Sequence, residues 1–501
     1  MKHFPDAGRA PIAVGVVALA LIATLNAGGY RFGVSDQAFY LPAILDELQP
    51  ALYPHDQAVL DSQDGLEVFD EISAATAEVT GVGVPWLFAV GYAAGLLLLF
   101  GAVVLLGRSF YQSGWAVSAL GLALTLRHRI TGTGVNTFEG YLHPRVLAFG
   151  LGTAALVAVL RGRPVATLPL LIGAAVLHPT TGAWFALWLG VALFVDAPRL
   201  RPYLAALAAG GIAVAAWALA EGPLAGRLVA MDGPWLAALA QKDYLFPADW
   251  PPAAWLVNLA YPLLVLIGFR VRRRDGLDVP GERGLVVGAL ALVLLFLGSL
   301  PLVGAKIALA VQLQIPRVFW MLDLLATVYV VWAIADRPRA RPAWHRLAIV
   351  TLIAVAAVGR GVWVTFVEGQ DRPGGSAVAR LDLPATDWSR VMTWLRTTPL
   401  DAHVLVDPGH AWRYGTSVRA AAHRDVFLEE VKDAALAIYS RSVAIRVTDR
   451  IRAVGNFQTM TESHAQELAV RYDLDYLVSD RQLALPPVFR AGRFVVYQLG
   501  R

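Results

Sequence analysis

The side chains that could do chemistry gather in three short stretches beside hydrophobic segments. The first stretch holds a lone carboxylate, Asp36, about ten residues after an apolar segment that ends near Asn26. An acid held just outside a bilayer is costly to place and is therefore a candidate functional group. We interpret Asp36 as a general base that would deprotonate an acceptor hydroxyl. The alternative is an ordinary solvated aspartate in a loop.

The second and third stretches combine histidines with cations at the ends of apolar segments. His143 and His178 each precede a proline, which disfavours helix in the residue before it, so both should lie at helix boundaries. Free N–H groups at a helix start favour an anion, and the planar guanidinium of Arg145 suits phosphate. The alternative is that the arginine only snorkels towards water. Candidate substrate-binding residues are Arg129, Arg145, His178, Lys306 and Arg317, and the candidate catalytic residues are Asp36, Glu139 and His143.

The residues of these stretches do not decide whether the protein binds a metal ion. Possible ligands are His128, Glu139, His143 and His178, without the tight spacing of a zinc motif. A weakly held divalent cation on Asp36 and Glu139 is the better metal hypothesis. The chain has no cysteine, which excludes disulfides and thiolate chemistry.

Hydrophobic segments must position these residues. The chain has 501 residues, of which 57% are hydrophobic and only 16% charged, whereas soluble domains carry about 25% charged residues. This composition predicts an α-helical polytopic membrane protein. A span needs about 20 apolar residues, and we predict about eleven spans, at 11–27, 83–106, 113–127, 143–160, 164–179, 181–196, 203–221, 252–269, 284–303, 317–335 and 346–366.

Basic residues flank these segments on one side. If every segment crosses, that side receives Arg108, Arg161 with Arg163, Arg199 with Arg201, Arg270 to Arg274, and Arg337 to Arg346. The positive-inside rule makes it the cytoplasm, so the candidate residues face the external side of the membrane. Insertion explains the net charge of +4, and nucleic acid is not an expected partner. The N-terminus resembles a signal peptide that we expect to be retained as the first span.

Two domains are predicted. Residues 1–370 would form the membrane domain with a long first external loop, 28–82, in which 38–48 has the spacing of an interfacial helix. A Pro-Gly-Gly linker at 373–375 would lead into an external α/β domain, 384–501. There we predict strands at 404–406, 476–478 and 494–497, and helices at 386–396, 425–454 and 467–472, the last opened by a capping box that begins at Ser463.

The arrangement resembles the GT-C superfamily of membrane glycosyltransferases, close to bacterial GT-C-like proteins of uncharacterised function. The likeness rests on Ser35-Asp36-Gln37, on His143-Pro-Arg145, on His178-Pro-Thr-Thr-Gly182 and on the strand region from Tyr472 to Val478. The resemblance implies a polyprenyl-phosphate sugar donor, transfer with inversion, Asp36 as the first-loop acid, and phosphate contacts at Arg145 and Arg317. The sequence departs from the family in lacking a paired acid, because Gln37 and Ala38 follow Asp36.

The predicted function is transfer of a sugar from a polyprenyl-phosphate-linked donor to a cell-envelope acceptor at the external membrane face. The alternative is a non-catalytic membrane protein that binds or presents a lipid-linked glycan during envelope polysaccharide assembly or export. A secondary transporter fits less well, since transporters place polar residues near the bilayer midplane, whereas these residues lie near one face.

Overall fold

The structure is a computed structural model that describes residues 9–63, 65–337 and 343–500. The chain forms two compact units. The helical unit comprises 1–29, 90–230 and 243–368, and the mixed unit comprises 30–89, 231–242 and 369–501. The N-terminal residues before Arg9 and the centre of the predicted basic loop 337–346 lie outside the described residues.

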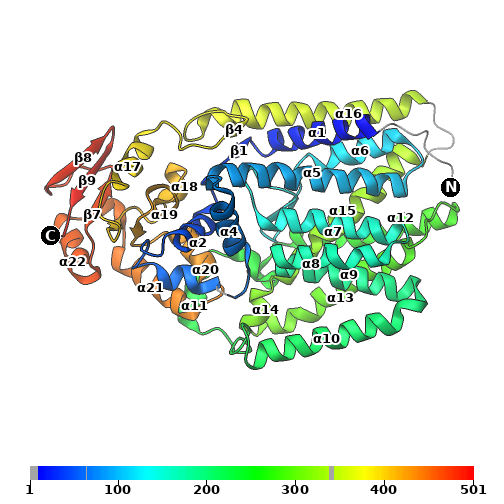
Figure 1. Cartoon of the computed structure of the whole chain (residues 1–501), viewed down its shortest axis with the longest axis horizontal. Coiled ribbons are helices and arrows are strands. Elements are labelled where there is room, and N and C mark those ends of the chain that lie inside the picture. The colour runs from blue at the N-terminus through cyan, green and yellow to red at the C-terminus, as the bar shows by residue number, and fades with distance from the viewer. Residues whose placement is uncertain (1–8, 64, 338–342, 501) are drawn as a thin grey trace. The chain divides into compact units, whose positions relative to one another are not determined.

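Apolar helices build the helical unit (Figure 1). They are α1 Arg9–Asn26, α5 Val84–Phe110, α6 Gly114–Leu124, α7 Pro144–Leu160, α8 Pro164–Leu177, α9 Pro179–Asp196, α10 Arg201–Ala220, α12 Pro252–Arg274, α13 Glu282–Gly304, α15 Val318–Val331 and α16 Ala343–Val362. Seven of the described helices are long and apolar enough to cross a membrane, and four apolar helices are shorter. Every predicted apolar segment is helical, which supports the predicted class of helical membrane protein. The number of crossings stays a prediction.

Small residues let these helices approach closely. A Cβ atom on Gly288 of α13 would lie 2.3 Å from the carbonyl oxygen of Trp188 on α9, and one on Gly284 would lie 2.4 Å from that of Ala192. Such backbone approach is typical of helices packed in lipid, where small residues line the interface. The most enclosed helix is α15, most of whose side chains are buried. It is therefore the central helix, and Arg317 stands at its start.

Several of the predicted basic loops meet at one end of the helical unit. Arg272 donates to the carbonyl oxygen of Phe110 at 3.2 Å, and Arg161 donates to that of Leu105 at 3.4 Å. Arg272 also pairs with Glu282 at 2.8 Å, and both side chains are fully buried. A buried guanidinium needs such a partner, because an isolated charge is very costly away from water.

The mixed unit contains a five-stranded sheet in the order β6-β5-β7-β9-β8. Its strands are β5 His403–Leu405, β6 Asp425–Val426, β7 Tyr476–Ser479, β8 Pro487–Ala491 and β9 Phe494–Gln498. Strands β6, β5 and β7 are parallel, and β9 is antiparallel to both β7 and β8. The packed helices are α17 Asp387–Leu395, α18 His410–Tyr414, α19 Val418–Ala422, α20 Glu430–Leu436, α21 Arg441–Val454 and α22 Glu462–Tyr472. The three predicted strands and the predicted helices at 386–396 and 467–472 are confirmed.

Two local predictions were wrong. The predicted helix 425–454 is instead β6, α20 and α21, because Val426 and Phe427 are fully buried and Val426 pairs with Val404 in the sheet. The cap of α22 is Thr461 rather than Ser463. Thr461 has the extended backbone that a cap needs and accepts the N–H of His464 at 3.3 Å, whereas Ser463 already lies within the helix.

The first loop folds with the C-terminal residues rather than with the membrane helices. It contains α2 Gln37–Leu48, α3 Gln57–Leu60 and α4 Phe69–Thr80, which all belong to the mixed unit. The expected helix at 38–48 is present, but its apolar side chains, including Tyr40, Leu41 and Ile44, are buried inside the unit. A short parallel pair of β1 Tyr30–Arg31 with β4 Ala379–Arg380 adds a further tie. The two units therefore divide the chain differently from the expected domains.

We predict that Glu282→Ala lowers the free energy of unfolding by about 3–5 kcal/mol, because Arg272 would keep a buried charge without its carboxylate. Asp275→Ala is the control, since its partner Arg337 is solvent-exposed and such pairs contribute at most about 1 kcal/mol. Thermal unfolding of the purified protein in detergent measures both. Equal stability of the two variants would contradict the prediction.

Candidate functional site

Four of the candidate residues come together at one end of the helical unit. His143 and His178 stand immediately before α7 and α9, with ring centroids 6.3 Å apart. Arg145, Arg317 and His143 all lie close enough to His178 to act on its charge. Two helix starts with two guanidinium groups beside them can bind an anion such as phosphate.

An aromatic stack fixes the helices that carry the two arginines. Phe149 lies one turn after Arg145 on α7, and Trp320 lies three residues after Arg317 on α15. Their rings are stacked with centroids 3.8 Å apart, and both side chains are buried. This contact holds together the two helices at whose starts Arg145 and Arg317 lie.

Both histidines cap helices through Nδ1. His143 Nδ1 accepts the backbone N–H of Arg145 at 3.3 Å, and His178 Nδ1 accepts that of Thr181 at 3.3 Å. The proline after each histidine fits the first helical position, where no N–H is needed. The His-Pro pairs therefore have a structural role in starting α7 and α9.

Glu139 is held by three donors from its own loop and from α7. Arg145 and Arg127 each donate to one of its oxygens at 2.7 Å, and Asn136 donates at 3.0 Å. Burial raises the pKa of Glu139, but the two arginines and Asn136 lower it by more, so it lies below the ordinary value. Glu139 is thus an ionised carboxylate already engaged by cations, which makes it a poor general base.

His128 pairs with a carboxylate that the sequence did not single out. Its Nδ1 lies 2.8 Å from Asp323 on α15, and its Nε2 lies 3.2 Å from the carbonyl oxygen of Ala123. Because both partners are acceptors, both ring nitrogens must carry a proton to bond them. Burial lowers the pKa of His128, but Asp323 raises it by more, to above the usual value. His128 is therefore a charged partner of Asp323 rather than a metal ligand.

The two remaining candidate cations lie in different surroundings. Arg129 is exposed on a hairpin formed by β2 Arg129–Ile130 and β3 Val135–Asn136. Lys306 has a positive φ of 58°, and its ammonium lies 3.8 Å from the ring centroid of Phe246. A cation over an aromatic face is stabilised there, so Lys306 has a structural partner of its own.

Asp36 lies in the mixed unit, just before α2, beside two lysines. Its Oδ1 accepts from the ammonium of Lys432 on α20 at 2.8 Å. The second lysine, Lys242, donates to the carbonyl oxygen of Val431 at 2.8 Å. Burial and the charge of Lys432 lower the pKa of Lys242 and Asp36 opposes them, with a net value of about 8. The charges of both ammonium groups therefore lie close to Asp36, the candidate base.

The carboxylates considered for a divalent cation are engaged by basic side chains instead. Asp36 has Lys432, and Glu139 has two arginines. Gln37, where a second acid could have helped, is buried and accepts the backbone N–H of Gly33 at 2.7 Å. Within the described part of the chain, no group of three or more His, Cys, Asp or Glu could hold a metal. The residues present do not fit a resident metal ion.

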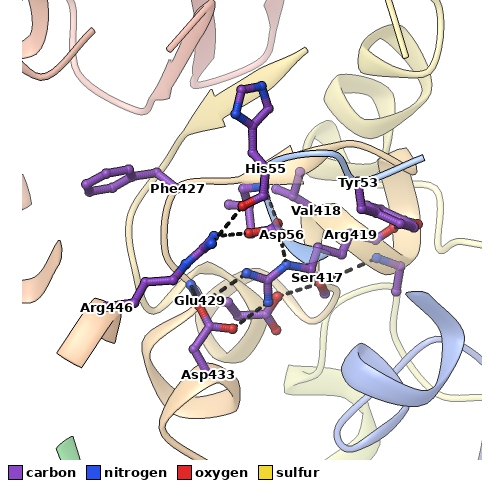
Figure 2. Close-up of polar contacts among 12 residues, drawn as sticks. Tyr53, His55, Asp56, Ser417, Val418, Arg419, Phe427, Glu429, Asp433 and Arg446 are labelled. Carbon is purple, nitrogen blue, oxygen red and sulfur yellow. Dashed lines mark hydrogen bonds and ion pairs between the residues drawn. The ribbon is translucent and has the colours of Figure 1, made fainter. Parts of the chain in front are cut away.

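A buried charge network ties the first loop to the C-terminal residues of the mixed unit (Figure 2). Asp56 accepts from Arg419 at 2.7 Å and from the backbone N–H of Val426 at 3.0 Å. Arg446 binds the other oxygen of Asp56, and Arg419 also pairs with Asp433 at 3.1 Å. Burial raises the pKa of Asp56, but Arg419 and Arg446 lower it by more, to well below the usual range. Its contribution to stability is therefore complete above the ordinary carboxyl pKa and is lost only in strong acid.

Two further acids beside this network, Glu429 and Asp425, have pKa values that are raised rather than lowered. Burial raises the pKa of Glu429 to about 7, and burial with the charge of Asp56 raises that of Asp425 to about 8. Both oxygens of Asp425 are buried, and the backbone of His55 is near enough to oppose the rise of its pKa. A neutral carboxyl is cheaper to bury than a charged one. As the pH rises from the ordinary carboxyl range to about 7–8, the unfolded chain releases these protons before the folded unit does. The stability of the unit therefore falls across this range and levels off above it.

Comparison with protein-family models and with curated proteins identifies no relative of this chain. No protein-family model matches the chain, and a search of curated proteins finds no match. The site must therefore be interpreted from its own residues.

Sequence reasoning missed Lys242, Lys432 and the arginines that bind Asp56. One signal could have found the lysines: the chain has 42 lysines and arginines together, and only four are lysines. In a chain that uses arginine almost throughout, a lysine marks a place where a compact, titratable ammonium is needed. No signal of this kind distinguishes Arg419 or Arg446 from the many other arginines.

We predict that Asp56→Ala lowers the free energy of unfolding of the mixed unit by about 3–5 kcal/mol, because Arg419 and Arg446 would lose their buried carboxylate. Asp61→Ala, an exposed acid of the same loop, should change it by less than about 0.5 kcal/mol. Limited proteolysis between pH 5 and 8 would measure both, and the difference should persist over that whole range. Similar protease resistance of the two variants would argue against a stabilising role of the network.

Proposed function

We propose that this protein is a membrane glycosyltransferase that moves a sugar from a polyprenyl-phosphate donor to a cell-envelope acceptor. The observation that carries the proposal is the grouping of Arg145 and Arg317 with His143 and His178 at the starts of α7 and α9. A cationic group beside apolar helices suits a ligand with a phosphate head and a hydrocarbon tail.

In the proposed reaction Asp36 takes the proton of the acceptor hydroxyl. The acceptor oxygen forms a bond to the anomeric carbon of the sugar while the bond from that carbon to the phosphate oxygen breaks. The polyprenyl phosphate leaves with an added negative charge, which a guanidinium such as that of Arg145 or Arg317 can stabilise. Each arginine would offer charge-assisted hydrogen bonds that strengthen as this charge develops.

Lys432 supports the role of Asp36 without a metal ion. Its ammonium holds one carboxylate oxygen at 2.8 Å, which orients the side chain. In the proposed reaction this contact, rather than a bound cation, holds the carboxylate.

The alternative function is binding or presentation of a lipid-linked glycan without catalysis. The ion pair between Asp36 and Lys432 favours it, since a carboxylate already paired in the ground state is a weaker base. In that case the cationic group of the helical unit would still hold the phosphate. The two functions differ in whether Asp36 is needed.

The proposal includes a topology and a compartment. The protein would span a bacterial plasma membrane, with the first loop and residues 367–501 outside and the loop Arg270 to Arg274 in the cytoplasm. The basis is the alternation of basic and non-basic loops along the sequence. A lipid-linked donor would then be used on the outer face of the membrane.

We predict that Asp36→Asn lowers the transfer rate about 10²–10⁴-fold while polyprenyl phosphate binding is retained, because the amide keeps its size but cannot accept the proton. Arg145→Ala and Arg317→Ala should weaken binding about 10- to 100-fold, since each removes charge-assisted hydrogen bonds. Complementation of the deletion strain's envelope phenotype measures function, and binding of polyprenyl phosphate to purified protein measures affinity.

Two controls accompany these variants. Asp61→Asn and Arg163→Ala change exposed side chains of the same types and should leave both readouts unaltered. Full complementation by Asp36→Asn, with both arginine variants defective, would replace the enzyme by the non-catalytic binder. Normal binding by both arginine variants would remove the phosphate site from either function.

For topology, we predict that reporter fusions at Gly65 and Gly409 give an external signal and a fusion at Arg273 gives a cytoplasmic one. Paired alkaline phosphatase and green fluorescent protein reporters distinguish the two sides. A cytoplasmic signal at Gly409 would overturn the proposed outer-face reaction.

A further inference from the structure

Helix α4 carries an apolar stripe that nothing in the mixed unit covers. Val68, Ile72, Ala75 and Val79 are all exposed, and their spacing of four, three and four residues places them on one face. Val79 is 85% exposed. The opposite face, which includes Phe69, packs inside the unit. The stripe is thus a surface feature of a helix whose other side is already anchored.

The polar groups of α4 are arranged for an apolar neighbour. The hydroxyls of Ser73, Thr76 and Thr80 donate to carbonyl oxygens one turn earlier in the same helix, each at 2.6 Å. A hydroxyl bonded in this way has no unsatisfied donor to bring into hydrocarbon. The exposed acids Glu71 and Glu78 flank the stripe on one side and can remain in water.

The stripe continues into a candidate membrane span. After α4 come exposed Val82 and Trp86, the latter in the first turn of α5 and 63% exposed. Phe88, also in α5, packs on Phe69 of α4 with ring centroids 6.0 Å apart. Because α5 is long and apolar enough to cross a membrane, its first turns lie where a span would leave the hydrocarbon. Tryptophan is enriched at that level.

We propose that α4 lies in the membrane–water interface with the stripe of Val68, Ile72, Ala75 and Val79 in contact with lipid. Continuity with the start of α5 favours lipid over a protein partner, since the chain passes within a few residues from the stripe through exposed Val82 and Trp86 into a candidate membrane span. The acidic flank favours a zwitterionic lipid surface, because anionic headgroups would repel it. The sequence had assigned this interfacial position to 38–48, whose apolar side chains are instead buried.

The absence of cysteine from the sequence permits a direct test. Val79→Cys places a single nitroxide label on the stripe, and Ile72→Cys provides a second position on it. Val470→Cys on α22 is the matched control, a valine 90% exposed in a polar helix of the same unit. The full-length protein in phosphatidylcholine nanodiscs is exposed to oxygen, which concentrates in lipid, and to a water-soluble nickel chelate.

We expect the labels at Val79 and Ile72 to collide with oxygen, to be shielded from nickel, and to lie about 5–10 Å below the lipid phosphates. The label at Val470 should be fully accessible to nickel. Nickel accessibility at Val79 equal to that at Val470 would overturn the proposal. Shielding of Val79 from both reagents, or broadening of its spectrum by a second label, would also overturn it, by identifying a protein partner or a second copy of the chain on the stripe.

Discussion

The ion pair between Asp56 and Arg419 is the interaction on which the mixed unit depends. Residues more than three hundred positions apart in the chain meet there, and water is excluded from both side chains. A buried pair contributes little to stability by itself, but removing either partner leaves the other with a buried charge that is only partly compensated. The first loop therefore cannot separate from the C-terminal residues without exposing this network. That constraint fixes α2, and with α2 it fixes Asp36 next to Lys432.

The same physical rule recurs in the candidate site of the helical unit. Glu139 is satisfied by Arg145 and Arg127, and Asp323 is satisfied by His128. The negative charges of Glu139 and Asp323 are thus balanced by neighbouring cationic side chains. A phosphate that enters the group around Arg145 must compete with Glu139 for the guanidinium. In the proposed function this competition would lower the affinity for the phosphate.

The sequence predicted the apolar helices and three of the sheet strands well, because both follow from local hydrophobic patterns. It also predicted that His143 and His178 mark helix starts, since proline restricts the residue before it. Residues 425–454 were assigned to one helix because a strand of two residues leaves almost no periodic signal. The grouping of 30–89 with 369–501 could not be predicted, because it depends on contacts such as Asp56 with Arg419 that no local pattern encodes.

The choice between arginine and lysine separates structural from candidate functional charges. Arginine stays protonated in proteins and binds carboxylates with a rigid fork, which suits permanent contacts such as those of Asp56 and Glu282. Lysine is a point charge whose pKa falls on burial, and for Lys242 it falls to about 8. Two of the chain's four lysines act on the surroundings of Asp36. Under the proposed function, positive charge that can be lost would lie beside the acid that takes up a proton, whereas permanent charge lies in the contacts that hold the fold.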